Sequence, residues 1–217
     1  MERRVKDKMR ETALEHRQQV LQQRLKEAGG CIGFGKIKGP LVLAKEKGDI
    51  VGTRREMKFK TIPPTVASQW ELVPAESEPE RGFFLFENAE GYKCGEPSFY
   101  NARPRYRPGK VYRVGVPSFR TKMKLLCLRA EPQKLSQMSE KDAVEELVQG
   151  AGINADGGPW WDYLALEFCC PTALASYRTM LAAEIGRDVW DEGLWFWAYR
   201  FEMVERPMDN QGPADEE

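Results

Sequence analysis

Three consecutive polar residues, Thr53, Arg54 and Arg55, place a hydroxyl and two guanidinium groups at the start of a predicted strand. The planar donor fork of arginine suits a phosphate or a carboxylate, and the neighbouring threonine adds a further donor. We therefore interpret this segment as a site that holds a phosphate or the edge of a base. The alternative is a pair of solvated basic residues at a strand end, with no ligand.

A second group of basic residues lies in the middle of the chain. Residues 92–134 carry 11 Lys and Arg against 2 Asp and Glu, a net charge of +9, although the whole chain has 33 of each. Basic side chains neutralise phosphates and aromatic faces stack on unpaired bases, so this mixture favours single-stranded or looped RNA. Arg105 and Arg107 are candidate ligand contacts here, and Lys38 is another. The alternative is that the aromatic residues form an ordinary core and the charges a solvated face.

Five of the six tryptophans lie between residues 160 and 197. Trp160 and Trp161 follow a Gly-Gly-Pro sequence, which predicts a loop, and we interpret them as a lid that stacks on a base. Trp195 and Trp197 alternate along a predicted strand, so they are expected on one face of it, packed in the core.

The composition argues against several kinds of site. His16 is the only histidine and lies in a highly charged leading segment, so histidine-dependent catalysis and histidine-rich metal sites are not expected. The five cysteines form no Cys-x-x-Cys pair, which argues against structural zinc and a disulfide framework. We expect neither a metal nor a cofactor. With no apolar run near the ~20 residues of a membrane helix and no secretory signal, we expect a cytoplasmic protein without membrane contact.

The hydropathy pattern predicts the elements that position these residues. Residues 3–27 lack Gly and Pro and predict a charged helix, whose incomplete apolar stripe either docks a protein partner or is solvated. Helices are expected from Pro40, Ser139 and Pro171, and strands at 31–37, 53–59, 66–73, 83–86, 111–116, 123–130 and 194–204. This irregular succession predicts an α+β domain built on a small twisted barrel. We expect a charged helix at 1–30, the domain at 31–205 and a disordered acidic tail at 206–217.

Four short motifs follow one another along the chain. They are an Ile-Lys-x-Pro start that leads to Thr-Arg-Arg, a Pro-Gly turn, an Asp-Ala-Val-Glu-Glu helix and a closing Trp-Phe-Trp strand, at residues 37–55, 106–109, 135–146 and 195–202. Together they resemble the ASCH-domain family, which is widespread in bacteria and their phages. The resemblance implies a small PUA-like β-barrel with flanking helices, and it implies a phage or prophage origin.

The resemblance also implies where activity would lie. In related acetylcytidine amidohydrolases catalysis is attributed to a lysine, a threonine and a glutamate, which fall by position on Ile50, Thr53 and Glu146. An isoleucine replaces the amine, so we expect a protein that binds RNA or a modified nucleoside, with Glu146 accepting a donor such as an exocyclic amine. One alternative is a small amidohydrolase or ribonuclease that uses Thr53, Glu146 and a lysine from outside the motif. Another is a phage accessory or assembly protein that docks a partner through residues 3–27.

Overall fold

The computed structural model describes residues 30–34, 38–59, 67–88, 98–116, 119–146 and 159–205. In this part of the chain strands predominate over helices, and the architecture is α+β, as expected. The helix predicted at 3–27 and the tail predicted at 206–217 lie outside the described residues.

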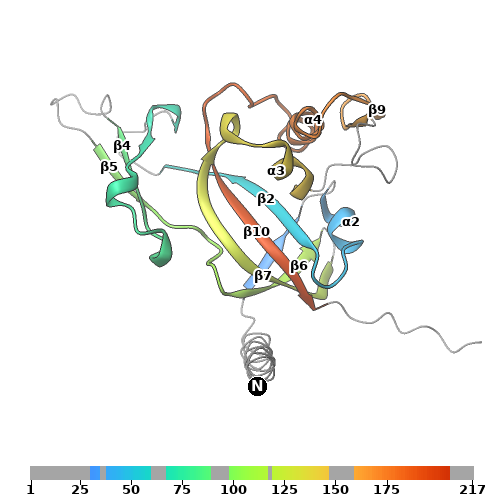
Figure 1. Ribbon diagram of the computed structural model, residues 1–217, viewed down its shortest axis with the longest axis horizontal. Coiled ribbons are helices and arrows are strands. Elements are labelled where there is room, and N and C mark those ends of the chain that lie inside the picture. Colours follow the sequence, from blue (N-terminus) through green and yellow to red (C-terminus); the bar gives the residue numbers. More distant parts are fainter. Residues whose placement is uncertain are drawn as a thin grey trace, which may run out of the picture.

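The main sheet has five strands in the order β1-β6-β7-β10-β2. Their bounds are Gly30–Gly33 for β1, Ile50–Glu56 for β2, Val111–Val116 for β6, Phe119–Lys134 for β7 and Trp195–Glu205 for β10. β1 pairs with β6 in parallel, whereas the other three pairings are antiparallel. Figure 1 shows β2, β10 and β7 crossing the centre of the molecule. Among the described strands this sheet closes into no barrel.

Two smaller sheets accompany the main one. A three-stranded antiparallel sheet contains β3 (Glu71–Leu72), β4 (Phe84–Asn88) and β5 (Ser98–Ala102), and it lies at one side of the molecule in Figure 1. A hairpin of β8 (Trp160–Asp162) and β9 (Glu167–Cys170) lies beside the last helix. Short 3₁₀ helices occupy Ala67–Gln69, Pro74–Glu76, Pro79–Arg81 and Leu135–Gln137.

Three α-helices are described, and local chemistry defines the ends of two of them. Their bounds are Lys38–Leu43 for α2, Glu140–Glu145 for α3 and Ala173–Ile185 for α4. Ser139 Oγ accepts a hydrogen bond from Asp142 N at 3.2 Å, and the Asp142 carboxylate accepts one from Ser139 N at 2.9 Å. This capping box confirms the predicted start of α3. Helix α4 begins after the N-cap Thr172 and ends at Gly186, whose φ of 84° favours glycine.

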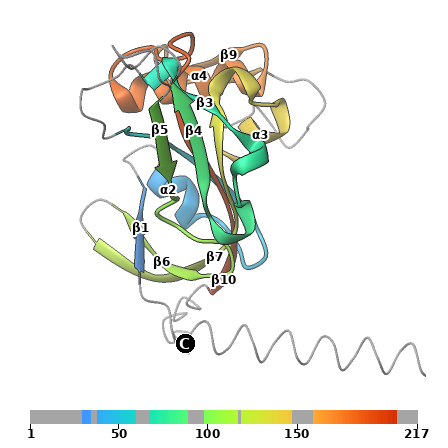
Figure 2. The same ribbon diagram turned by 90° about the vertical axis from the view of Figure 1, so that its left-hand side faces the viewer.

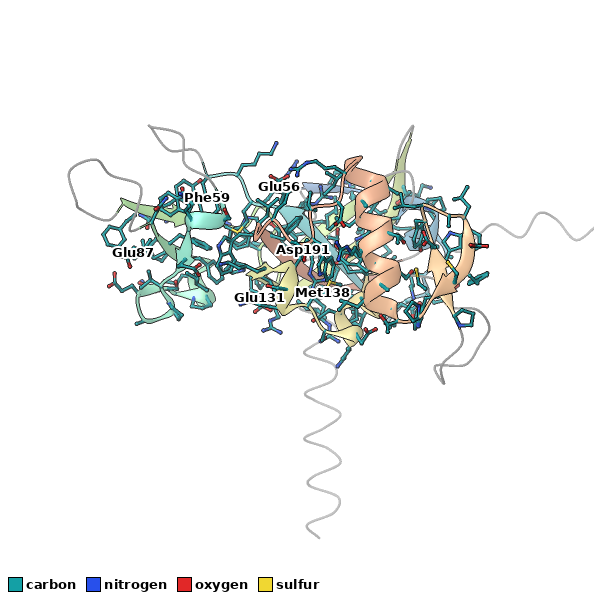
Figure 3. All side chains as sticks on the ribbon, turned by 90° about the horizontal axis from the view of Figure 1, so that it is seen from above. Glu56, Phe59, Glu87, Glu131, Met138 and Asp191 are labelled. Carbon is teal, nitrogen blue, oxygen red and sulfur yellow. The ribbon has the colours of Figure 1, made fainter. Side chains whose placement is uncertain are left out.

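Two apolar cores lie on opposite faces of β10, because successive side chains of a strand point to opposite faces. Trp195, Trp197 and Tyr199 belong to the first core, which β10 shares with β1, β2, β7 and the three-stranded sheet. Phe196 belongs to the second core, beneath α3 and α4. These two helices lie together at one end of the molecule (Figure 2). In Figure 3, viewed from above, Met138 lies beside α4, and Phe59 and Glu87 lie toward the small sheet.

Helix α2 differs from the prediction at both ends. It begins at Lys38 rather than at Pro40, and a proline is accommodated there because N–H groups of the first turn have no partner within a helix. It ends at Leu43, so Ala44, expected on the buried side, is exposed. The turn beyond it is tied to the sheet, since Gly48 N donates to Met203 O at 2.7 Å.

Several strand predictions also differ from the structure. The strand expected at 53–59 is β2 at Ile50–Glu56, so Thr53 lies in its middle and not at its start, and the strand expected at 31–37 ends at Gly33.

Residues 66–73 were expected as a strand, but only Glu71–Leu72 is extended, after a 3₁₀ turn and the buried Trp70. Strand β7 extends well beyond the predicted 123–130, because β10 pairs along it through two register shifts. Strand β5 was not predicted. No helix among the described residues has the length and apolar character needed to span a membrane.

Candidate functional site

A buried carboxylate forms the centre of a polar cluster beneath α3 and α4. Glu146, at the C-terminal cap of α3, is fully buried. Lys38 Nζ donates to its Oε2, and Arg54 Nη1 donates to its Oε1 at 2.8 Å. Both side-chain cations are only 5 % exposed. Two cations therefore share one carboxylate away from water. We call Lys38, Arg54, Gln133, Glu146 and Tyr177 the Glu146 cluster.

The guanidinium of Arg54 is held on two further sides. Gln133 Oε1 accepts from Arg54 Nε at 3.2 Å and from Nη2 at 2.6 Å. Asp142 Oδ2 lies 3.8 Å from Arg54 Nη2 and adds a second, more exposed negative charge. Burial raises the pKa of Asp142, but hydrogen bonds from Ser139 and the charge of Arg54 lower it by more, so the net shift is downward. Each of the three nitrogens of Arg54 thus donates to a protein group among the described residues, so the side chain is held in place by Glu146 and Gln133.

Tyr177 of α4 covers the cluster. Lys38 Nζ lies 5.2 Å and Arg54 Cζ 6.0 Å from the centre of its ring, which is within the range of cation–π attraction. Its buried hydroxyl has no hydrogen-bond partner among the described residues. Burial, and then the charge of Glu146, raise the pKa of Tyr177 well above its usual value, so the phenol stays neutral.

Gly52 allows α3 to approach the sheet. A Cβ on Gly52 would meet the backbone carbonyl carbon and oxygen of Glu145 at 3.0 Å and Glu146 N at 3.2 Å. Because those atoms are backbone, they cannot move aside as a flexible side chain would. Because Gly52 has no side chain, α3 lies close enough to β2 for Glu146 to contact Arg54. Arg54 follows Gly52 by two residues and so lies on the same face of the strand.

We expect the Gly52→Ala variant to lose about 1–3 kcal/mol of unfolding free energy through this overlap. Urea denaturation followed by circular dichroism measures the loss. Gly33→Ala is the matched control, since a Cβ on Gly33 meets nothing within 4 Å. Equal stabilities of the two variants would show that α3 does not rest on Gly52.

A second cluster forms on the opposite face of β2. Arg55 donates from Nη2 to Gly33 O, and its Cζ lies 5.6 Å from the centre of the Tyr106 ring. Arg105 Cζ lies at the same 5.6 Å from that ring. Tyr106 itself is only 2 % exposed, in the first core. We call Arg55, Arg105 and Tyr106 the Tyr106 cluster.

The loop after β5 carries exposed cations on a fixed backbone. Tyr199 Oη accepts from Arg105 N at 3.1 Å, and Tyr112 Oη accepts from Arg107 N at 2.8 Å. Burial raises the pKa of both tyrosines, so their hydroxyls stay protonated. The loop and the strand after it expose Arg103, Arg105, Arg107, Lys110 and Arg113.

The structure separates residues that the sequence analysis assigned to one ligand. Thr53, Arg54 and Arg55 were expected to act together, but alternation along β2 divides them. Arg54 faces α3, whereas Thr53, opposite Tyr199 in the sheet, shares the other face with Arg55. Thr53 is 4 % exposed. The structure therefore brings Lys38, Arg54 and Glu146 together and places Thr53 on the far side of the sheet from Glu146.

No family model, no curated protein and no solved structure matches the chain.

Trp160 and Trp161 were expected in a loop, and this was wrong. They begin strand β8, where pairing with β9 satisfies their backbone. Trp161 packs edge-on against Phe168 with ring centres 4.8 Å apart, and Trp160 packs against the second core. Both rings thus pack within the hairpin and against the second core, and neither belongs to the Tyr106 cluster.

Sequence reasoning missed several residues of these sites. Gln133 had no signal, because its role depends on β7 pairing with β10. Tyr177 lies on the apolar side of a predicted helix and gave no indication of a polar neighbourhood. Asp162, Cys169 and Cys170 are the group of possible metal ligands that the described residues bring together. Cys169 and Cys170 are adjacent, so they form no Cys-x-x-Cys motif that would indicate a metal site.

Proposed function

We propose that this chain is a PUA-like domain of the ASCH type that binds RNA through the Tyr106 cluster and the loop after β5. Residues 97–130 contain nine Lys and Arg and no Asp or Glu. The five exposed cations of residues 103–113 make no ion pair with any other described residue. This unpaired positive surface on an anchored loop is the observation that carries the proposal.

The fixed backbone of the loop favours a specific ligand over a diffuse counterion layer. Two tyrosine hydroxyls hold the N–H groups of Arg105 and Arg107, so their side chains project from defined positions. A preformed surface loses little conformational entropy when it binds. Phe99, on the strand that leads into the loop, is 57 % exposed and offers an aromatic face for an unpaired base. These features favour single-stranded RNA over a duplex.

The Glu146 cluster supports a structural role and not the hydrolase alternative. Lys38 supplies the amine that Ile50 lacks, but its Nζ is bound to Glu146, and both side chains are buried. Thr53 faces the other side of the sheet. A lysine, a threonine and a glutamate are therefore present but do not converge on one reacting atom.

The positions of the four motifs are consistent with the ASCH resemblance. The first spans α2 and β2, the second forms the turn before β6, the third forms α3 and the fourth forms β10. In the structure β2 pairs with β10, and α3 packs on Gly52 of β2. The motifs are thus neighbours in space as well as ordered in sequence.

Fluorescence anisotropy with a labelled single-stranded RNA of mixed sequence tests the proposal. We expect salt-sensitive binding that the Arg105→Ala/Arg107→Ala variant weakens. Two lost phosphate contacts lower the salt slope by about 1.4, which corresponds to roughly 25-fold in affinity at 0.1 M salt. An Arg81→Ala/Arg187→Ala variant loses the same charge from exposed sites outside the loop and should bind as the parent does. Absence of salt-sensitive binding, or equal affinities of the two variants, would overturn the proposal.

A further inference from the structure

The β8–β9 hairpin brings two thiols and a carboxylate together. One ligand atom from each of Asp162, Cys169 and Cys170 lies within 4.8 Å of the other two. Cys169 Sγ donates to Asp162 Oδ2 at 3.8 Å. In a tetrahedral zinc site with Zn–S bonds of about 2.3 Å, neighbouring ligand atoms lie about 3.5–3.8 Å apart. The three groups are therefore close to a metal-binding spacing before any adjustment.

A register shift in the hairpin explains how adjacent cysteines reach one carboxylate. In a regular strand Cys169 and Cys170 would point to opposite faces. Here Trp160 pairs with Cys170 and Trp161 with Phe168, so Cys169 is an extra residue that opposes no partner. Such a bulge re-aims side chains, and it turns both thiols toward Asp162.

Asp162 is already oriented for such a role. Its Oδ1 accepts hydrogen bonds from Leu164 N at 2.8 Å and Ala165 N at 2.9 Å, which leaves Oδ2 facing Cys169. These hydrogen bonds lower the pKa of Asp162 below its usual value, and the bond from Ala165 has the larger effect. Metal-bound carboxylates in proteins are commonly oriented by hydrogen bonds of this kind.

Hydrogen bonds join the hairpin to α4 and so restrict the positions of the three groups. Ser176 Oγ donates to Trp161 O at 2.5 Å, and Thr179 Oγ1 accepts from Tyr163 N at 3.0 Å. Cys170 is 5 % exposed against α4, whereas Cys169 is exposed. A metal ion could thus enter from solvent on the side of Cys169.

The charge around the three groups favours a cation. No Lys or Arg of the described chain forms an ion pair with Asp162, and Glu167 adds negative charge beside Cys169. A divalent ion would compensate the negative charge of this carboxylate and of two thiolates.

We propose that Asp162, Cys169 and Cys170 bind Zn²⁺, with a solvent water as the fourth ligand. On binding, each thiol releases its proton to solvent and forms a Zn–S bond, and Asp162 Oδ2 forms the third protein bond. A Cys₂Asp set with an open position is compatible with the ligand preferences of zinc. The proposal is independent of RNA binding, since it uses none of the residues of the Tyr106 cluster.

Titration of the chelator-treated full chain with Co²⁺, followed by absorption spectroscopy, tests the site. We expect thiolate-to-cobalt charge-transfer bands that saturate at a single equivalent and disappear when Zn²⁺ is added. The Cys169→Ser/Cys170→Ser variant should lose the bands. The Asp162→Asn variant should bind at least about tenfold more weakly, since even groups that only orient metal ligands contribute that much.

Cys31→Ser and Cys94→Ser are the controls, because each removes a thiol from outside the hairpin, and both should retain the bands. The single Cys169→Ser variant changes only an exposed side chain. It therefore tests metal binding even if the double variant does not fold. Binding of Co²⁺ without charge-transfer bands, or bands that survive loss of Cys169, would overturn the proposal.

Discussion

Replacing Glu146 with glutamine is expected to lower the free energy of unfolding by about 3–5 kcal/mol. The change keeps the shape of the side chain but removes the charge that Lys38 and Arg54 share. Both cations are almost fully buried, so water cannot replace the lost partner. For a domain of this size the loss corresponds to a melting temperature lower by roughly 6–20 °C.

Thermal unfolding followed by circular dichroism measures this effect, and the neighbouring residue provides the control. Glu145 Oε1 pairs with Arg200 Nη2 at 2.9 Å, but Arg200 is 41 % exposed. The Glu145→Gln variant should therefore lose no more than about 1 kcal/mol. If the two variants melt together, Glu146 does not neutralise buried charge.

A Trp70→Ala variant is expected to lose about 3–5 kcal/mol, because it empties a fully buried site between the small sheet and β10. The Trp70 ring stacks on Phe59 with centres 5.1 Å apart and meets Tyr100 edge-on at 6.0 Å. Its backbone carbonyl also accepts a hydrogen bond from Trp195 Nε1 at 2.6 Å. The substitution preserves this bond only if the backbone around residue 70 keeps its conformation. The small sheet should therefore loosen from the main sheet.

Urea denaturation reports both the stability and the surface exposed on unfolding. Phe99→Ala on β5 is the matched control, since it removes an exposed aromatic ring from the same small sheet and should change stability by less than about 0.5 kcal/mol. A Trp70→Ala variant as stable as Phe99→Ala would mean that the small sheet does not depend on this ring.

Local patterns in the sequence were sufficient to predict much of the element order. The capping box at Ser139, the helix after Pro171 and the alternation of Trp195 and Trp197 each depend on residues close in the chain. Where pairing partners are distant, prediction failed. Strand β5 and the extra length of β7 are stabilised by other strands, which no local pattern reveals.

The sequence indicated several residues of the candidate sites, but it did not indicate which of them lie together. Lys38 and Glu146 were each selected from the sequence, but their contact joins positions 108 residues apart. Arg54 and Arg55 were assigned to a shared ligand, although strand alternation alone separates them. A zinc site was not expected because the five cysteines form no Cys-x-x-Cys pair, and adjacent residues of a regular strand point to opposite faces. Only the bulge at Cys169 turns both thiols toward Asp162.

The alternation along β2 restricts how the chain length can vary. Arg54 completes the Glu146 cluster on one face, and Arg55 reaches Tyr106 on the other. A one-residue shift of this strand would exchange its two faces. A deletion before Thr53 would move Arg54 to the buried position that Thr53 holds, and an insertion there would place Thr53 beside the Glu146 carboxylate where Arg54 now lies. We therefore expect changes of chain length to be tolerated in the turns that flank β2 and not within it.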